Sequence, residues 1–289
     1  NLTVSATGAV TINRSLTNHA AGTVRVVANS NIFVNAAVTS NGGTVVLNSD
    51  RDQTTTPGGG IVVTANVTSN GGNITLGGGT DPSTNAAIGT ATTLDGVRVD
   101  GATLNAGAGD ISVRGTSSRD DGVQFENGGV ARTTIGNIEL IGGSTATNNA
   151  NGVELEDAAT LVTSDQGDIT LIGTASTGDG VDITDATVSS TGGVVASAGA
   201  VLIDGTTAGS DGVFLSGSAM VTAVAGMMTI EGDATAGGED GVHVGSAASV
   251  TSTGPAPNAT SITIDGTGGT LNAVFLEGSI TTVDAAIVI

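Results

Sequence analysis

The strongest chemical regularity in this chain is a column of aspartate or asparagine residues, each followed directly by glycine. Its members recur at intervals of about thirty residues and are Asp95, Asp121, Asn151, Asp179, Asp211 and Asp240. If copies of the repeat stack in register, neighbouring members lie about 5 Å apart, and carboxylates at that distance raise one another's pKa. A calcium ion would compensate the charge, because Ca²⁺ accepts several carboxylate oxygens. The candidate calcium ligands are Asp121, Asp179, Asp211 and Asp240.

A turn explains the same column without a metal. In an Asp-Gly turn the carboxylate accepts hydrogen bonds from nearby backbone N–H groups, and Asn151 does the same without charge. The sequence favours this alternative, because the glycine-rich nonapeptide typical of calcium-binding repeats does not occur in it. No other metal or cofactor is expected.

A second column lies two residues after each of these glycines, between two apolar positions. It changes along the chain from charged to aromatic residues and ends in Phe214, His243 and Phe275. Exposed aromatic residues are enriched at interfaces, so these three side chains are a candidate contact face. The alternative is that corner loops cover them.

Catalysis is not expected. Glycan lyases and hydrolases need paired carboxylates or a cation with a basic residue. This chain has many carboxylates, but it lacks Trp, Tyr and Lys, and its two histidines, His19 and His243, are far apart. The alternative to a non-enzymatic protein is a carbohydrate-active β-helix in which a loop at residues 77–94 shapes a cleft beside acidic residues.

Three short apolar segments make up each repeat. Residues 167–171, 179–183 and 186–188 show the pattern, in which apolar and polar positions alternate. A period of two indicates strands, and the connectors are too short for the helices that a doubly wound sheet needs. The repeat therefore predicts an all-β protein, a parallel β-solenoid with three strands per turn and about nine turns around an apolar core. The 47 glycines are expected at corners that need positive φ.

The repeats continue without a linker, so residues 1–289 are expected to form one domain. Residues 1–30 form a less regular entry turn, and residues 95–289 hold the regular repeats. The turns within residues 31–94 are looser and carry loops at 48–59 and 77–94. Both ends of the chain look like solenoid strands. This predicts either a piece of a longer solenoid or end-to-end stacking of copies.

Charge limits the choice of partners. The net charge is −20, and no Lys or Arg follows Arg132. Nucleic acids and anionic membranes are bound through basic residues, so neither is an expected partner; glycans, surface proteins or cations are. The chain has no cysteine, which fits an exported protein. It also lacks an apolar run long enough to cross a membrane.

The segments at residues 36–47, 151–155 and 167–171 resemble the repeats of filamentous-haemagglutinin-type exoproteins and related giant bacterial surface proteins. The resemblance implies a right-handed β-helix, export across the outer membrane, and a role in adhesion, biofilm or surface coating. The amino-terminal secretion domain of two-partner secreted adhesins is not recognisable. We therefore expect a non-enzymatic structural or adhesive rod or filament, secreted to the extracellular surface of a bacterium.

Overall fold

The computed structural model describes residues 1–53, 58–192, 199–235, 237–254, 261–283 and 286–289. These residues form strands, turns and bends and contain no helix, so none of them offers a helical membrane span. The predicted loop at residues 48–59 lies partly outside the described residues. The all-β prediction is confirmed.

Three parallel sheets, here named A, B and C, make up the fold. Sheet A contains β1 (Leu2–Ala6), β4 (Val24–Ala28), β7 (Val45–Ser49), β10 (Ile74–Gly78), β14 (Ile111–Ser117), β17 (Ile138–Ser144), β20 (Ile169–Ala175), β23 (Val201–Thr207), β26 (Met228–Ala234), β29 (Ile262–Thr267) and β32 (Ile287–Val288), with β11 (Ala87–Ile88) paired to β14. Sheet B contains β2 (Val10–Ile12), β5 (Ile32–Val34), β8 (Ile61–Val63), β12 (Val97–Asp100), β15 (Val123–Glu126), β18 (Val153–Glu156), β21 (Val181–Thr184), β24 (Val213–Ser216), β27 (Val242–Val244) and β30 (Val274–Leu276). Sheet C contains β3 (Leu16–Asn18), β6 (Val38–Ser40), β9 (Val67–Thr68), β13 (Thr103–Gly107), β16 (Val130–Thr133), β19 (Leu161–Ser164), β22 (Thr187–Ser190), β25 (Met220–Ala223), β28 (Ser249–Ser252) and β31 (Ser279–Thr282).

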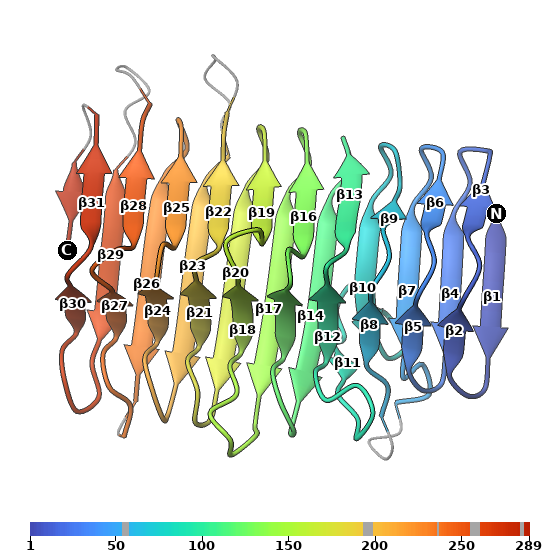
Figure 1. Ribbon diagram of the computed structural model, residues 1–289, viewed down its shortest axis with the longest axis horizontal. Coiled ribbons are helices and arrows are strands. Elements are labelled where there is room, and N and C mark those ends of the chain that lie inside the picture. Colours follow the sequence, from blue (N-terminus) through green and yellow to red (C-terminus); the bar gives the residue numbers. More distant parts are fainter. Residues whose placement is uncertain (54–57, 193–198, 236, 255–260, 284–285) are drawn as a thin grey trace.

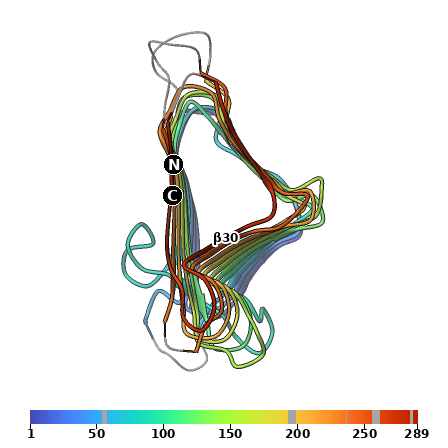
Figure 2. The ribbon, with the colours of Figure 1, turned by 90° about the vertical axis from the view of Figure 1, so that its left-hand side faces the viewer.

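The chain visits sheets A, B and C in that order in each turn, and successive turns stack along the long axis (Figure 1). Seen from one end, the three sheets form the walls of a triangular tube (Figure 2). This is the predicted parallel β-solenoid with three strands per turn. Residues 1–30 already contain β1 to β4, and β1 pairs with β4 over its whole length.

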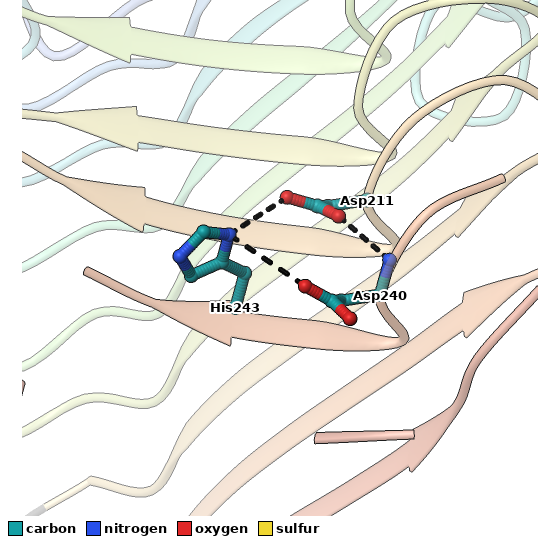
Figure 3. A group of neighbouring side chains, drawn as sticks. All are labelled: Asp211, Asp240 and His243. Atoms are coloured by element: carbon teal, nitrogen blue, oxygen red, sulfur yellow. Dashed lines mark hydrogen bonds and ion pairs between the residues drawn. The ribbon is translucent and has the colours of Figure 1, made fainter. Parts of the chain in front are cut away.

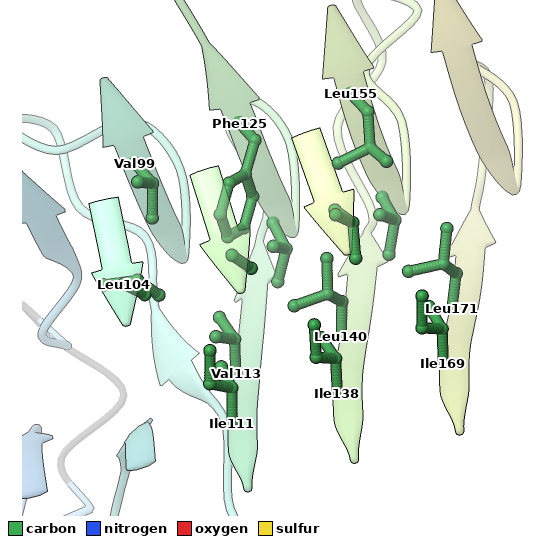
Figure 4. Packing of buried hydrophobic residues seen from close by; sticks show 14 of the residues in the cluster. Val99, Leu104, Ile111, Val113, Phe125, Ile138, Leu140, Leu155, Ile169 and Leu171 are labelled. Carbon is green, nitrogen blue, oxygen red and sulfur yellow. The ribbon is translucent and has the colours of Figure 1, made fainter. Parts of the chain in front are cut away.

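The in-register pairing of strands stacks apolar side chains of successive turns on one another. In sheet B, Val99 pairs with Phe125 and Phe125 with Leu155, and all three side chains are fully buried. Sheet A stacks Ile111, Ile138 and Ile169 in the same way. The inward side chains of the three sheets meet in one continuous core (Figure 4). Full burial of each such side chain contributes about 1.5–3 kcal/mol, which explains why the alternating pattern specifies the fold.

The repeated glycines differ from the expectation. The glycines of the Asp-Gly pairs, such as Gly122 and Gly180, do not have positive φ. These glycines lie at the corner before sheet B, where the backbone of sheet A comes close. A Cβ on Gly180 would overlap the amide nitrogen of Thr206 and would lie 2.5 Å from the carbonyl oxygen of Gly212. Close backbone approach, rather than a left-handed conformation, therefore requires glycine at this corner. Positive φ is needed at other glycines, among them Gly101 and Gly217.

Candidate functional site

The Asp/Asn column forms a hydrogen-bonded ladder at the corner before sheet B. The side-chain Oδ1 of each member accepts a hydrogen bond from the backbone N–H at the same position of the next turn. The donor–acceptor distances are 3.2 Å for Asp121 to Asp95, 2.6 Å for Asn151 to Asp121, 2.7 Å for Asp179 to Asn151, 2.8 Å for Asp211 to Asp179, 2.8 Å for Asp240 to Asp211 and 2.7 Å for Asn272 to Asp240. We call this set the Asx ladder.

The Asx ladder provides hydrogen-bond acceptors for the buried backbone N–H groups at this corner. The glycine after each member donates forward, as Gly122 does to the carbonyl oxygen of Asn151 at 3.1 Å. The N–H of the member itself reaches back to the preceding turn, where its acceptor is a side-chain oxygen. A buried N–H needs an acceptor, and an amide serves as well as a carboxylate, as Asn151 shows. This is the backbone-bonding arrangement that the sequence favours, except that the bond joins neighbouring turns.

A second ladder of the same kind begins sheet A, and the sequence analysis missed it. Oδ1 of Asn73, Asp110, Asn137 and Asp168 accepts from the backbone N–H one turn further on, at 3.0, 2.9, 2.9 and 2.7 Å. The signal that could have revealed it is an Asn or Asp directly after the glycine in four successive segments of the 167–171 type, at Gly72, Gly109, Gly136 and Gly167. Because these side chains are exposed, they are less constrained than the Asx ladder.

Burial controls the protonation of the Asx ladder. It is the main reason why the pKa of Asp95 is raised to about 7, and why that of Asp179 is raised to about 6. Burial and then the neighbouring charge of Glu154 raise the pKa of Asp121 to about 10. Glu154 accepts hydrogen bonds from Gln124 Nε2 at 2.6 Å and from Asn151 Nδ2 at 3.0 Å. Asp121 is therefore a neutral acid at pH 7, and it lies beside a carboxyl group that two amide side chains hold in place.

The three side chains predicted as a contact face stack on the outer side of sheet B; whether they contact a partner stays a prediction. Phe214, His243 and Phe275 lie on β24, β27 and β30 and pair in register. The His243 ring meets Phe214 at 5.0 Å and Phe275 at 4.9 Å between centroids, both edge to face. Phe275 is 36% exposed, and the other two are partly buried. Aromatic pairs of this geometry contribute about 0.5–1.5 kcal/mol beyond their burial, so the three rings support one another.

The stack continues into the Asx ladder through His243. Its Nδ1 lies 3.2 Å from Asp211 Oδ2 and 3.8 Å from Asp240 Oδ2 (Figure 3). Burial raises the pKa of Asp211, while the N–H of Asp240 and the imidazole oppose that shift. The structure thus joins two side chains predicted as calcium ligands with one predicted for the contact face.

The four predicted calcium ligands do not gather at one point. Among the described residues, Asp211 and Asp240 group with His243, and Asp121 groups with Asp95 and Asp120. Asp179 belongs to neither group. In each ladder member Oδ1 is already bound to a backbone N–H, whereas Ca²⁺ takes six to eight oxygen ligands. A calcium column along the whole ladder would therefore have at most one further carboxylate oxygen from each turn, fewer than Ca²⁺ needs.

Comparison of the chain with protein-family models, curated proteins and solved structures found no match. The resemblance to filamentous-haemagglutinin-type repeats stays a prediction, and the function has to be argued from the geometry.

Proposed function

We propose that this protein is a non-enzymatic structural or adhesive rod of a bacterial cell surface. The observation that carries the proposal is the in-register stacking of three parallel sheets around one apolar core. Such a stack turns sequence length directly into axial length, at about 4.8 Å per turn, so the nine intervals between the ten strands of sheet B extend about 45 Å. A repeated outer surface on a stiff support is what an adhesin or a coat filament requires.

The last turn exposes apolar side chains at one end of the solenoid. Leu276, Ile287 and Val288 in the last strands are 36%, 43% and 53% exposed. The residues that two of them pair with one turn earlier, Val244 and Ile262, are fully buried. Under the proposal another turn covers this face, from the same chain as a longer solenoid or from a second copy stacked end to end.

The outer surface supports the choice of partners. Acidic side chains line the later turns of sheet A, with Asp204, Glu231 and Asp265 paired in register. Such a surface repels nucleic acid and anionic membranes. Under the proposal, glycans or surface proteins bind the rod, and the Phe214, His243 and Phe275 rings are the apolar part of the contact.

Antibody labelling of intact cells of the producing bacterium tests the location. An antibody against the folded protein should label unpermeabilised cells, and deletion of the gene should reduce attachment to glycan-coated or abiotic surfaces. Permeabilised cells are the control for antibody access. Labelling only after permeabilisation, or unchanged attachment of the deletion strain, contradicts the proposal.

One observation favours a carbohydrate-active enzyme as a second candidate. Asp121 and Glu154 are neighbouring carboxyl groups, and burial and then the charge of Glu154 raise the pKa of Asp121 to about 10, as in the proton donor of an acid–base pair. Asp121→Asn keeps the ladder acceptor and removes the acid, and Glu154→Gln removes the base. If the protein depolymerises an acidic or neutral glycan and either variant abolishes this activity, the enzyme replaces the rod as the primary function. If both variants and the wild type are equally inactive, the rod stands.

A further inference from the structure

Two buried carboxylates and one imidazole converge on a single point at the corner before β27. One ligand atom from each of Asp211, Asp240 and His243 lies within 4.8 Å of the other two, and Nδ1 of His243 lies 3.2 Å from Asp211 Oδ2 and 3.8 Å from Asp240 Oδ2. The aspartate side chains are 6% and 5% exposed, and the histidine side chain is 22% exposed. We propose that this trio is a binding site for a divalent transition-metal ion, with Zn²⁺ as the best match.

The distances fit a tetrahedral ion. Zinc binds imidazole nitrogen and carboxylate oxygen at about 2.0–2.2 Å, which sets ligand atoms about 3.4 Å apart in a tetrahedron. The observed separations of Nδ1 from the two Oδ2 atoms, 3.2 and 3.8 Å, bracket that value.

The carboxylates are held in position by contacts that a metal would not disturb. Oδ1 of Asp211 accepts from the Asp240 N–H at 2.8 Å, and Oδ1 of Asp240 accepts from the N–H and Nδ2 of Asn272 at 2.7 and 2.8 Å. Both Oδ2 atoms remain directed toward His243 (Figure 3). Outer hydrogen bonds of this kind orient metal ligands and raise affinity.

The imidazole is equally constrained. The rings of Phe214 and Phe275 contact it from the two neighbouring turns, at 5.0 and 4.9 Å between centroids. Its Nδ1 faces the two carboxylates, and its other nitrogen points away from them (Figure 3). The side chain therefore presents one ligand atom in one direction.

Charge and ligand type select the ion. Two carboxylates and one neutral imidazole balance the charge of one divalent ion, so the occupied site has no net charge. A nitrogen ligand and only two free oxygens disfavour Ca²⁺ and Mg²⁺, which prefer all-oxygen sites with more ligands. Three protein ligands leave a fourth position for water, as in open zinc sites.

The proposal is independent of the rod function and is tested by calorimetric titration of the chelator-treated protein with ZnCl₂. We expect one Zn²⁺ per chain, with a dissociation constant that rises at least tenfold in His243→Gln and in Asp240→Asn. The asparagine variant keeps the Oδ1 acceptor, as Asn151 does in the native ladder, so it preserves the fold while removing a ligand.

Two matched controls sharpen the result. His19→Gln removes the other histidine of the chain, and Asp179→Asn changes the same ladder one turn before Asp211. Both should bind Zn²⁺ like the wild type, and a hundredfold excess of CaCl₂ should not displace the zinc. The proposal is overturned if the wild type does not bind Zn²⁺, if His243→Gln and Asp240→Asn bind it as tightly as the wild type, or if Ca²⁺ competes at equal concentration.

Discussion

At the scale of single residues, the Asx ladder depends on an oxygen acceptor rather than on a charge. Asn151 occupies a ladder position beside aspartates, and its Oδ1 accepts the Asp179 N–H at 2.7 Å. A protonated aspartate offers the same acceptor on one oxygen and carries its proton on the other. Burial favours the neutral form of Asp95, Asp121 and Asp179, while the ladder hydrogen bond to each of them favours the charged form, and burial is the larger effect.

Two substitutions of Asp121 distinguish the effect of its hydrogen-bond acceptor on stability from the effect of its charge. Asp121→Asn should leave the free energy of unfolding at pH 7 unchanged or raise it, because the Asn151 N–H keeps its acceptor. Asp121→Ala should lower it by about 1–3 kcal/mol, the cost of an unsatisfied buried donor. Urea unfolding followed by circular dichroism measures both. Equal destabilisation by the two variants would show that the carboxylate charge is needed.

Stability should fall as pH rises from about 5 to 8. Asp95, Asp179 and Asp182 have folded-state pKa values raised to about 7, 6 and 8, chiefly by burial, whereas an unfolded aspartate has a pKa of about 3.9. The folded chain therefore binds more protons in this range, and deprotonation lowers the free energy of unfolding. Hydrogen bonds from Ser83 and Ser218 lower the pKa of Asp81 and Asp185, so those groups act only in stronger acid.

Thermal unfolding at constant ionic strength tests whether stability falls as the pH rises. The melting temperature should decrease from pH 5 to pH 8, and the decrease should be smaller in Asp95→Asn, which cannot titrate. A melting temperature that rises over the same range would contradict the burial of protonated acids in the ladder.

At the scale of the strand, the alternating pattern determines which side chains enter the core, and the core is continuous from turn to turn. Phe125 on β15 tests this most sharply, because it is fully buried between Val99 and Leu155. Phe125→Ala should lower the free energy of unfolding by about 3–5 kcal/mol. Phe33→Ala, on the outer face of the same sheet, should cost no more than about 1 kcal/mol. Similar losses for both would mean that the inward assignment is wrong.

The glycine at the corner before sheet B gives a separate prediction. Gly180→Ala should destabilise the protein by at least about 3 kcal/mol, because its Cβ would meet backbone atoms of two neighbouring segments. Gly8→Ala is the control, since no atom lies within 4 Å of that Cβ, and it should change stability by less than about 0.5 kcal/mol. Thermal or urea unfolding measures both. If Gly180→Ala is tolerated like Gly8→Ala, close approach is not what requires glycine there.

Sequence alone predicts the strands and the stacked aromatic residues because both depend on a period of two and on equal spacing between turns. Val181 and Ile183, for example, are assigned inward by alternation and are fully buried. The sequence does not predict that His243 contacts Asp211 and Asp240. That contact depends on the side-chain directions at one corner and on the small offset between turns. Nor does it predict why Gly180 is glycine, since close approach comes from a segment in another sheet.

At the scale of the whole molecule, turns add length while each turn contacts only its neighbours. The same repeated backbone can therefore carry different outer residues, from Arg98 through Glu154 to Phe214, without a change in the core. Under the proposed function, the net charge of −20 keeps such rods apart sideways, and copies associate end to end. This arrangement is the physical basis for the proposed role as a surface rod.

The most direct test of that role is electron microscopy of the native full-length protein taken from the cells that make it. The account predicts unbranched rods or filaments, at least about 45 Å long, with the 4.8 Å axial spacing of stacked parallel strands. Compact particles without elongation or axial spacing would contradict it.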